Sequence, residues 1–205
     1  MANYSKPDSW ALRAQREGYP ARSVYKLSEL NEQFRLLHPR GASTSRILDL
    51  GAAPGSWSLY VLRHIGQACQ LTACDLSPLS RVHGKGLFDR DNFFFIQGDM
   101  TDEATQAAIL ERAPYHVVIS DAAPATMGSR SIDTLRSLAL AETALFYAET
   151  ALTTGGNFAV KVFQGGDTIT LLKRLREIFT SAKSFKPKAC RRESFETYYL
   201  GLGKK

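Results

Sequence analysis

The side chains best suited to chemistry are three aspartates that each follow or end a short apolar run. Asp49 lies in "RILDLGAAPGSWS", Asp75 ends "LTACD" and Asp99 ends "FFFIQGD". Apolar runs of this length are typical of strands that a sheet buries on both faces. Ligands of open α/β sheets bind beyond the carboxyl ends of the strands, so we expect the three acids to meet at one such site.

The first of these runs leads into a glycine loop. Gly51 and Gly55 allow the backbone to approach a ligand closely, and Ser56 can cap the helix that follows. The spacing Gly-x-x-x-Gly differs from the G-x-G-x-x-G of dinucleotide sites and from the G-x-x-x-x-G-K-[ST] of phosphate-binding loops. Because no lysine follows to meet phosphates and acids surround the loop, we expect a ligand that carries positive charge and hydroxyls.

The positions of the acids indicate an adenosine-type cofactor. Asp75 follows the second strand, where an acid commonly accepts hydrogen bonds from ribose hydroxyls, and Asp99 suits an adenine amino group. S-adenosylmethionine, with its ammonium and sulfonium groups, fits a site lined by Asp49, Asp75 and Asp99 better than NAD does. The alternative is that these acids are only helix caps and turn residues.

A second group of candidates contains two lysines and two acids. Asp121 follows the apolar run "HVVIS", and Lys161 lies inside the apolar run "FAVKVF". A lysine is rarely buried without a partner, so a purely structural role for Lys161 is the weaker interpretation. Glu196 begins the last apolar run, and Lys26 lies in "ARSVYKLSEL", where it would be a solvated helix lysine if taken alone.

These candidates depend on alternating strands and helices to position them. The apolar runs predict strands over 46–50, 69–75, 93–97, 115–120 and 156–163. The intervening patterns predict helices over 9–17, 22–37, 56–65, 102–112, 134–153 and 168–179. This alternation implies an α/β fold with a mostly parallel sheet. Residues 182–189 and 196–203 have no helical crossover between them, so we expect an antiparallel hairpin at the sheet edge.

The composition is that of one globular domain preceded by an arm. The chain has 205 residues, of which 44% are hydrophobic, and we divide it into a basic arm over 1–20 and a single domain over 21–205. No apolar run approaches the ~20 residues of a membrane span, and the N-terminus lacks the apolar stretch of a secretory signal. Three cysteines without a C-x-x-C pair predict a reduced, cytoplasmic compartment.

The positive charge is concentrated at the two ends of the chain. The net charge is +6, with a balance of +4 over residues 1–46, +5 over 183–205 and −3 between them. Such ends suit a polyanion such as RNA, although a solvated basic surface without a partner explains the charge equally well. The candidate RNA contacts are Lys6, Arg13, Arg16, Arg22, Arg35, Arg40, Lys186, Lys188, Arg191 and Arg192. Tyr4, Trp10 and Tyr19 could stack on bases or pack the arm onto the domain.

At this point the sequence resembles the FtsJ/RrmJ family of ribose 2′-O-methyltransferases. The segments "DLGAAPGSWS", "ACDLSP", "FIQGDMTDE", "SDAAP", "VKVFQG" and "ESFETY" occur in the family's order, and the resemblance runs from Tyr19 to the C-terminus. It implies a Rossmann-like S-adenosylmethionine-dependent methyltransferase fold with a mostly parallel seven-stranded sheet and an antiparallel C-terminal strand. It also implies 2′-O-methylation of a ribose, of a uridine, in large-subunit ribosomal RNA, by a cytoplasmic monomer that acts on that RNA or on the 50S subunit.

The resemblance also assigns residues. The family's Lys-Asp-Lys-Glu tetrad maps onto Lys26, Asp121, Lys161 and Glu196. Its cofactor contacts map onto Gly55, Trp57, Asp75, Asp99 and Asp121, in addition to Asp49 and Gly51 from the reading of the loop.

The sequence departs from the family after the fourth strand. The family pattern "SDMAPN-x-SG" is "SDAAPATMG" here, so Ala125 replaces an asparagine and Met127 replaces a serine, whereas Gly128 and Asp133 keep their places. The departure concerns the loop expected to meet the substrate, and therefore the choice of nucleotide, and it leaves the tetrad intact.

Methyl transfer to a ribose hydroxyl needs positioning and a proton acceptor. Burial and a second amine nearby both disfavour the charged form of an amine, so we expect Lys161 to act as the general base. Asp121 and Glu196 would orient the two amines, and Lys26 would steer the hydroxyl or a phosphate. We expect no metal site, because the carboxylates occupy separate strand ends and the four histidines (His38, His64, His83 and His116) share no ligand spacing.

Three other functions remain open at this stage. The first is the same chemistry on a tRNA anticodon loop or an mRNA cap, and the second is a binding module for ribosome assembly that keeps the fold without turnover. The intact tetrad argues against the second. The third is an NAD-linked oxidoreductase, which the missing G-x-G-x-x-G argues against.

Overall fold

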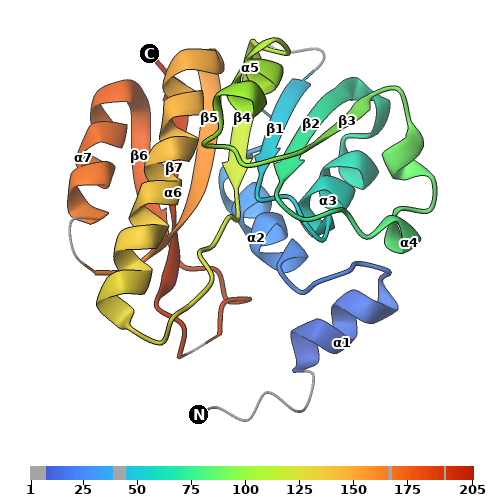
Figure 1. The fold of residues 1–205 in the computed structure, drawn as a ribbon, viewed down its shortest axis with the longest axis horizontal. Coiled ribbons are helices and arrows are strands. Elements are labelled where there is room, and N and C mark those ends of the chain that lie inside the picture. The colour runs from blue at the N-terminus through green and yellow to red at the C-terminus, as the bar shows by residue number, and fades with distance from the viewer. Residues whose placement is uncertain (1–7, 39–44, 166–167, 192) are drawn as a thin grey trace.

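The computed structural model describes residues 8–38, 45–165, 168–191 and 193–205, and these form a sheet in the order β3-β2-β1-β4-β5-β7-β6 (Figure 1). Five strands are parallel: β1 Ser45–Leu50, β2 Cys69–Asp75, β3 Phe93–Gln97, β4 Tyr115–Ser120 and β5 Leu152–Phe163. The last two, β6 Phe179–Phe185 and β7 Glu196–Lys204, are antiparallel to their neighbours. The predicted seven-stranded, mostly parallel sheet with an antiparallel edge hairpin is thus confirmed.

The helices cover both faces of the sheet. They are α1 Ser9–Arg16, α2 Val24–Phe34, α3 Ser56–His64, α4 Arg81–Gly84, α5 Glu103–Leu110, α6 Arg130–Ala151 and α7 Thr168–Ile178, with 3₁₀ turns at 66–68 and 87–89. Helices α2 and α3 pack on one face, and α6 and α7 pack on the other (Figure 1). No helix in the described part of the chain is long and apolar enough to cross a membrane.

Several predicted boundaries are wrong; α6, for example, begins at Arg130 and ends at Ala151, where the prediction was 134–153. Two of the differences have local reasons. Helix α2 ends at Phe34 because Arg35 adopts the left-handed backbone conformation, with φ +53°. Helix α6 runs directly into β5, which begins at Leu152, before the predicted start at Gly156. Gly155 and Gly156 therefore both lie inside the strand, where Gly155 has φ +79° beside an irregularity in the pairing with β4. Phe163, at the other end of β5, donates its N–H to Ser137 Oγ of α6 (3.0 Å).

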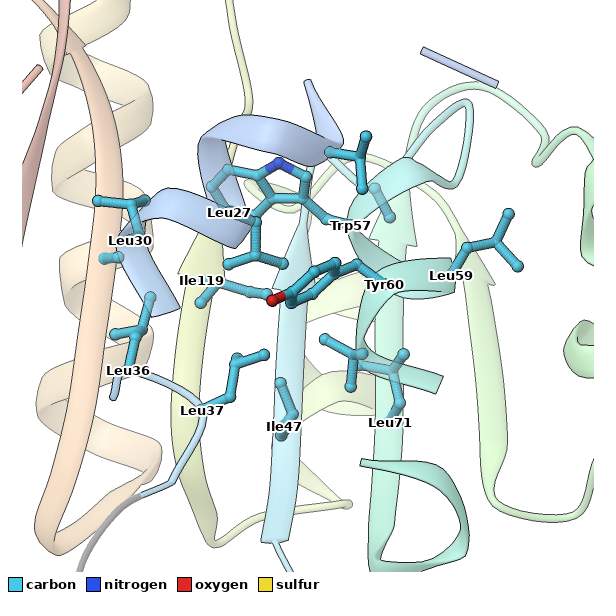
Figure 2. Close-up of a cluster of buried hydrophobic side chains, with 14 of the residues drawn as sticks. Leu27, Leu30, Leu36, Leu37, Ile47, Trp57, Leu59, Tyr60, Leu71 and Ile119 are labelled. Atoms are coloured by element: carbon cyan, nitrogen blue, oxygen red, sulfur yellow. The ribbon is translucent and has the colours of Figure 1, made fainter. Parts of the chain in front are cut away.

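The face covered by α2 and α3 holds a dense apolar cluster that fixes both helices (Figure 2). Leu27 and Leu30 are three residues apart and therefore share one side of α2, and both are fully buried against the sheet. Trp57 and Tyr60 of α3 fill the adjoining space. Burial of each such side chain contributes about 1.5–3 kcal/mol, so the cluster holds the helix that carries Lys26 firmly on the sheet.

The glycine loop after β1 depends on close contact with the loop after β4. Gly51 has φ +73°, and a Cβ added there would lie only 2.6 Å from the Cα of Ala122. Gly55 has φ +111°, and its Cβ would lie 2.8 Å from the ring of Phe88. Both positions therefore require glycine for space and for backbone conformation.

The described part of the predicted arm packs onto the domain. The ring of Trp10 lies 5.1 Å from that of Tyr25, with the Arg13 guanidinium over Tyr25. Tyr19 is buried beneath Arg63, which also donates to the carbonyl of Gly18 (3.0 Å). Trp10 and Tyr19 thus pack the arm onto the domain, as one of the two alternatives held, whereas Tyr4 lies outside the described residues.

One acid lies inside the core. Asp49 of β1 is fully buried; its Oδ2 accepts a hydrogen bond from Ser58 Oγ (2.7 Å), and its Oδ1 has no partner among the described residues. Burial raises the pKa of Asp49 to about 7, against the lowering effect of the Ser58 hydrogen bond, and the charges of Asp121 and Asp75 add to the rise.

The raised pKa of Asp49 makes stability depend on pH. Between about pH 4 and pH 7 the folded chain holds a proton that the unfolded chain has released, so stability falls as the pH rises through this window. We expect Asp49→Asn, which cannot ionise, to gain stability relative to the wild type between pH 5 and pH 8. The gain should be a few kcal/mol, because one pKa unit corresponds to about 1.4 kcal/mol.

Urea unfolding of both proteins at the two pH values measures this difference. Asp89→Asn, which alters an exposed carboxylate, serves as the control and should follow the wild type. An equal pH dependence in Asp49→Asn and the wild type would contradict the prediction.

Candidate active site

A cavity of about 470 Å³ opens beyond the carboxyl ends of β1 to β4, within the size range of small-molecule sites. Five of the predicted site residues line it, namely Gly51, Asp75, Asp99, Asp121 and Lys161. The remaining wall consists of Ser23, Ala53, Pro54, Cys74, Leu76, Gly98, Met100, Thr101, Ala122, Ala123 and Leu140. The sequence patterns gave no reason to single out these small and apolar residues.

The acids of the cavity are held by backbone groups. Asp75 accepts hydrogen bonds from the N–H groups of Ala53 (2.9 Å, Oδ2) and Ser77 (2.8 Å, Oδ1) and so ties the glycine loop to β2. Asp99 Oδ1 accepts from the N–H and the hydroxyl of Thr101, and these bonds lower the pKa of Asp99. These bonds leave lone pairs free on both carboxyl groups, so each acid can accept a further hydrogen bond from a ligand.

The charge of the lining favours a cationic ligand. Three carboxylates (Asp75, Asp99 and Asp121) face the cavity against one amine, that of Lys161, and none of the arginines that the structure describes lines it. A phosphate would meet repulsion here, whereas an ammonium or sulfonium would be attracted. The three carboxylates that line the cavity therefore fit S-adenosylmethionine, the cofactor expected from the sequence.

Three predicted cofactor contacts are not among the lining residues. Asp49 is buried in the core, and Gly55 lies against Phe88. Trp57 donates its Nε1–H to the carbonyl of Ser23 (2.9 Å), which does line the cavity. These residues support the loops that form the wall, and their direct contact with a cofactor stays a prediction.

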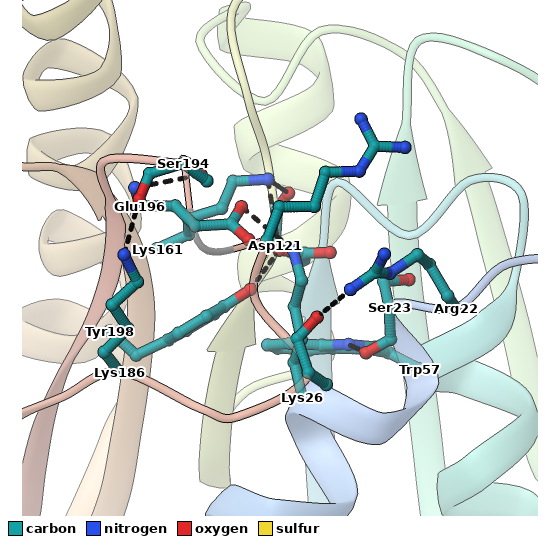
Figure 3. A network of polar contacts seen from close by, with 12 residues as sticks. Arg22, Ser23, Lys26, Trp57, Asp121, Lys161, Lys186, Ser194, Glu196 and Tyr198 are labelled. Carbon is teal, nitrogen blue, oxygen red and sulfur yellow. Dashed lines mark hydrogen bonds and ion pairs between the residues drawn. The ribbon is translucent and has the colours of Figure 1, made fainter. Parts of the chain in front are cut away.

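The four residues of the predicted tetrad meet beside the cavity (Figure 3). Lys26 Nζ lies 2.9 Å from Glu196 Oε2, and Lys161 Nζ lies 3.1 Å from Asp121 Oδ1 and 2.5 Å from the carbonyl oxygen of Asp121. The four come from α2, the end of β4, β5 and the start of β7, segments far apart in sequence. The two lysines are 8% and 7% exposed, so each amine is removed from water together with its partner.

The burial and pairing fix the charge of two members. Burial lowers the pKa of Lys26, but attraction to Asp121 and Glu196 raises it above the ordinary lysine value. Burial raises the pKa of Asp121, but Lys161 and Lys26 outweigh this and lower it. Lys26 is therefore an ammonium and Asp121 a carboxylate at neutral pH.

Tyr198 is a member of this network that sequence reasoning did not single out. Its hydroxyl donates to Asp121 Oδ1 (2.6 Å), and its ring lies beneath the Lys26 amine (6.0 Å) and beside Trp57 (5.8 Å). Burial raises the pKa of Tyr198 well above its usual value, so the hydroxyl remains a donor. Alternation along β7 places Tyr198 on the same face as Glu196, two residues before it, and this was the available signal.

A thiol also lies near the network. Burial, reinforced by the charge of Glu196, raises the pKa of Cys190 to about 12. The group therefore stays a neutral thiol at physiological pH and is a poor nucleophile.

The loop after β4 is pinned by helix α6. Met127, one of the two unusual residues, donates its N–H to Asp133 Oδ1 (2.8 Å), and Arg136 donates to the carbonyl of Ala125 (3.2 Å). Asp133 is buried, whereas the Met127 side chain is 68% exposed. The loop thus has a fixed backbone and presents the Met127 side chain to solvent.

The predicted RNA contacts divide between the site and other surfaces. Arg22 donates to the carbonyl of Ala189 and forms an ion pair with Asp8, and Arg191 lies 3.9 Å from Asp8. Lys186 and Lys188 are exposed on the connection that leads to Glu196. Arg13 and Arg16 lie on α1, and Arg35 lies at the end of α2. Lys6, Arg40 and Arg192 lie outside the described residues.

Comparison with known proteins shows the family to which the chain belongs. The model of the family described as FtsJ-like methyltransferase matches residues 19–204. The "Ribosomal RNA large subunit methyltransferase E" of Treponema denticola is 52% identical over 200 residues, covering 97% of this chain and 96% of the relative. The protein of the same name from Nitratidesulfovibrio vulgaris (strain DP4) is 43% identical over 198 residues, covering 96% and 92%.

A solved structure is similar over nearly the same length. The crystal structure of a putative ribosomal RNA methyltransferase from Plasmodium falciparum matches with a TM-score of 0.74 and 25% identity, covering 91% of this chain and 98% of the other. The family match spans the sheet, the acid-lined cavity and all four tetrad residues. This chain therefore belongs to the FtsJ-like methyltransferase family.

Proposed function

We propose that this protein transfers the methyl group of S-adenosylmethionine to a ribose 2′-hydroxyl of large-subunit ribosomal RNA. One observation carries the proposal: Lys161 both lines the acidic cavity and belongs to the tetrad, so the methyl donor and the hydroxyl would meet at one amine. The name shared by the relatives supports ribosomal RNA as the substrate. The motif resemblance extends the proposal to a uridine, with a monomer acting in the cytoplasm on RNA or on the 50S subunit.

The cavity residues would hold the cofactor by charge and hydrogen bonds. Asp75 would accept from ribose hydroxyls, Asp99 from the adenine amino group, and Asp121 would lie toward the sulfonium. Gly51 keeps the wall free of a side chain where the loops after β1 and β4 meet. The bound cofactor supplies an electrophilic methyl group with a good leaving group.

The tetrad would hold and deprotonate the hydroxyl. Lys26 is kept as an ammonium by two acids, so it donates hydrogen bonds and orients the ribose oxygen. Lys161, desolvated in β5, would first release one proton from its ammonium to solvent, and the neutral amine would then accept the proton of the hydroxyl as its oxygen attacks the methyl carbon. Asp121 and Glu196 hold the two amines in place by charge-assisted hydrogen bonds, and positioning of this kind supplies up to about 7–11 kcal/mol of the barrier reduction.

The basic residues around the site would bind the RNA backbone. Lys186 and Lys188 are exposed on the connection adjoining the tetrad, whereas Arg22 is already engaged by Asp8 and the Ala189 carbonyl. Contacts of lysines with the backbone give affinity that falls with salt and carries little sequence information. Shape and single-stranded access would then select the nucleotide.

Substitution of Lys161 tests the base. Lys161→Ala removes the amine, and Lys161→Arg keeps a positive charge that cannot give up its proton. We expect both variants to lose methyl transfer by on the order of 10²- to 10⁴-fold, with S-adenosylhomocysteine binding retained. Lys173→Arg, on the exposed side of α7, is the control in a single-turnover assay with 50S subunits. A Lys161→Arg protein with near wild-type rate would rule out proton transfer to this residue.

Substitution of Asp75 tests the cofactor site. Asp75→Asn removes a charge that would accept from the ribose, and a hydrogen bond to a charged group contributes about 1.5–3 kcal/mol. We expect the affinity for S-adenosylhomocysteine, measured by calorimetry, to fall on the order of ten- to a hundredfold. Asp89→Asn, outside the cavity, should bind like the wild type. Unchanged affinity in Asp75→Asn would place the ribose elsewhere.

Mapping of ribose methylation identifies the substrate. Deletion of the gene should remove a single mark from large-subunit ribosomal RNA, which the wild-type gene restores and the Lys161→Ala gene does not. Loss of a transfer RNA or cap mark instead would contradict the ribosomal substrate, and loss of no mark would contradict the enzymatic function.

A further inference from the structure

The connection between β6 and β7 is attached to helix α2 at a point away from the tetrad. Glu29 accepts two backbone hydrogen bonds from it, one from the N–H of Lys188 to Oε2 (2.7 Å) and one from the N–H of Ala189 to Oε1 (2.8 Å). Arg22 donates to the carbonyl of the same Ala189. Both backbone groups of Ala189, a fully buried residue, are thus satisfied by side chains from residues 22 and 29.

This attachment lies on the same side of α2 as the tetrad amine. Lys26 and Glu29 are three residues apart and therefore neighbours on the helix surface. Lys26 contacts Glu196, the first residue of β7, and Glu29 contacts Lys188 and Ala189, near the start of the connection. One side of α2 therefore contacts this region twice, through Lys26 and through Glu29, and Glu29 does not line the cavity.

We propose that Glu29 is a positioning residue, which acts through the connection to hold Glu196 against Lys26. The inference deepens the proposed function, on which it rests. Without the Glu29 carboxylate, the N–H of Ala189 is left buried and unpaired, so the connection must shift to find another acceptor. Glu196 begins β7 further along, where its backbone pairs with Phe163 of β5, so a shift of the connection would reorient its carboxylate and weaken its contact with the Lys26 amine.

Two graded variants and a matched control test this role. Glu29→Ala removes both acceptors, and Glu29→Gln keeps the length and one acceptor oxygen. Glu32→Ala and Glu32→Gln change the charge equally at an exposed residue of the same helix, which contacts Ser28 of that helix. We expect kcat at saturating 50S subunits to fall in the order wild type, Gln, Ala, by on the order of ten- to a hundredfold for Ala, as for small misplacements of reacting groups.

The affinity for S-adenosylhomocysteine should stay unchanged in the Glu29 variants, and the Glu32 variants should match the wild type in both quantities. A folded Glu29→Ala protein with wild-type kcat would overturn the proposal. If Glu29→Ala does not fold, Glu29→Gln carries the same comparison.

A double-mutant cycle separates positioning of Glu196 from a general effect on stability or RNA binding. In a Glu196→Gln background, Glu29→Ala should lower kcat little further, because the two substitutions disrupt one unit. A full additional loss in that background would overturn the proposal.

The proposed function can fail separately from this inference. Wild-type protein that methylates no ribose contradicts the function, whereas hydrogen exchange still tests the attachment. We expect the amides of Lys188 and Ala189 to exchange faster in Glu29→Ala than in Glu32→Ala, and equal exchange would contradict the attachment.

Discussion

The structure depends on the pairing of four charges that water does not reach freely. A single buried lysine or carboxylate costs several kcal/mol unless an opposite charge and hydrogen bonds compensate it. Lys26 with Glu196 and Lys161 with Asp121 satisfy this condition only if α2, the end of β4, β5 and the start of β7 converge within hydrogen-bond distance. The convergence of these segments is therefore a condition for burying the charges at all, as well as for any chemistry that they perform.

The same pairing separates the electrostatics of two adjoining spaces. The cavity side is dominated by carboxylates, while the tetrad side presents an ammonium whose charge is maintained by Asp121 and Glu196. Asp121 lines the cavity and is also a member of the tetrad, and the hydroxyl of the fully buried Tyr198 donates a hydrogen bond to it. A cation placed in the cavity would share Asp121 with Lys161, so the two spaces are coupled through one carboxylate.

Much of the fold was predictable because its signals are local. The apolar runs marked β2, β3 and β4 to the residue, because each run is continuous and is bounded by turn or polar residues. The tetrad was implied by the family resemblance, and the structure brings its four members together. Tyr198 and Glu29 were not predicted, because their roles arise from contacts with residues 77 and about 160 positions away. The burial of Asp49 and Trp57 likewise depends on how α3 packs, which no single segment encodes.

Helix α6 continues directly into β5, so the strand that carries Lys161 and the helix that holds the loop after β4 form one continuous segment. The chain passes from α6 into β5 at Leu152, and the other end of β5 is hydrogen-bonded to α6 through Ser137. Asp133 of α6 also accepts a hydrogen bond from the loop that carries Met127. Strand β5, which carries Lys161, and the backbone of that loop are thus both bonded to α6. The side chain of Met127 is exposed to solvent. A substitution of the Met127 side chain would therefore change the surface of this loop while leaving the backbone bond to Asp133 and the position of the Lys161 amine in place.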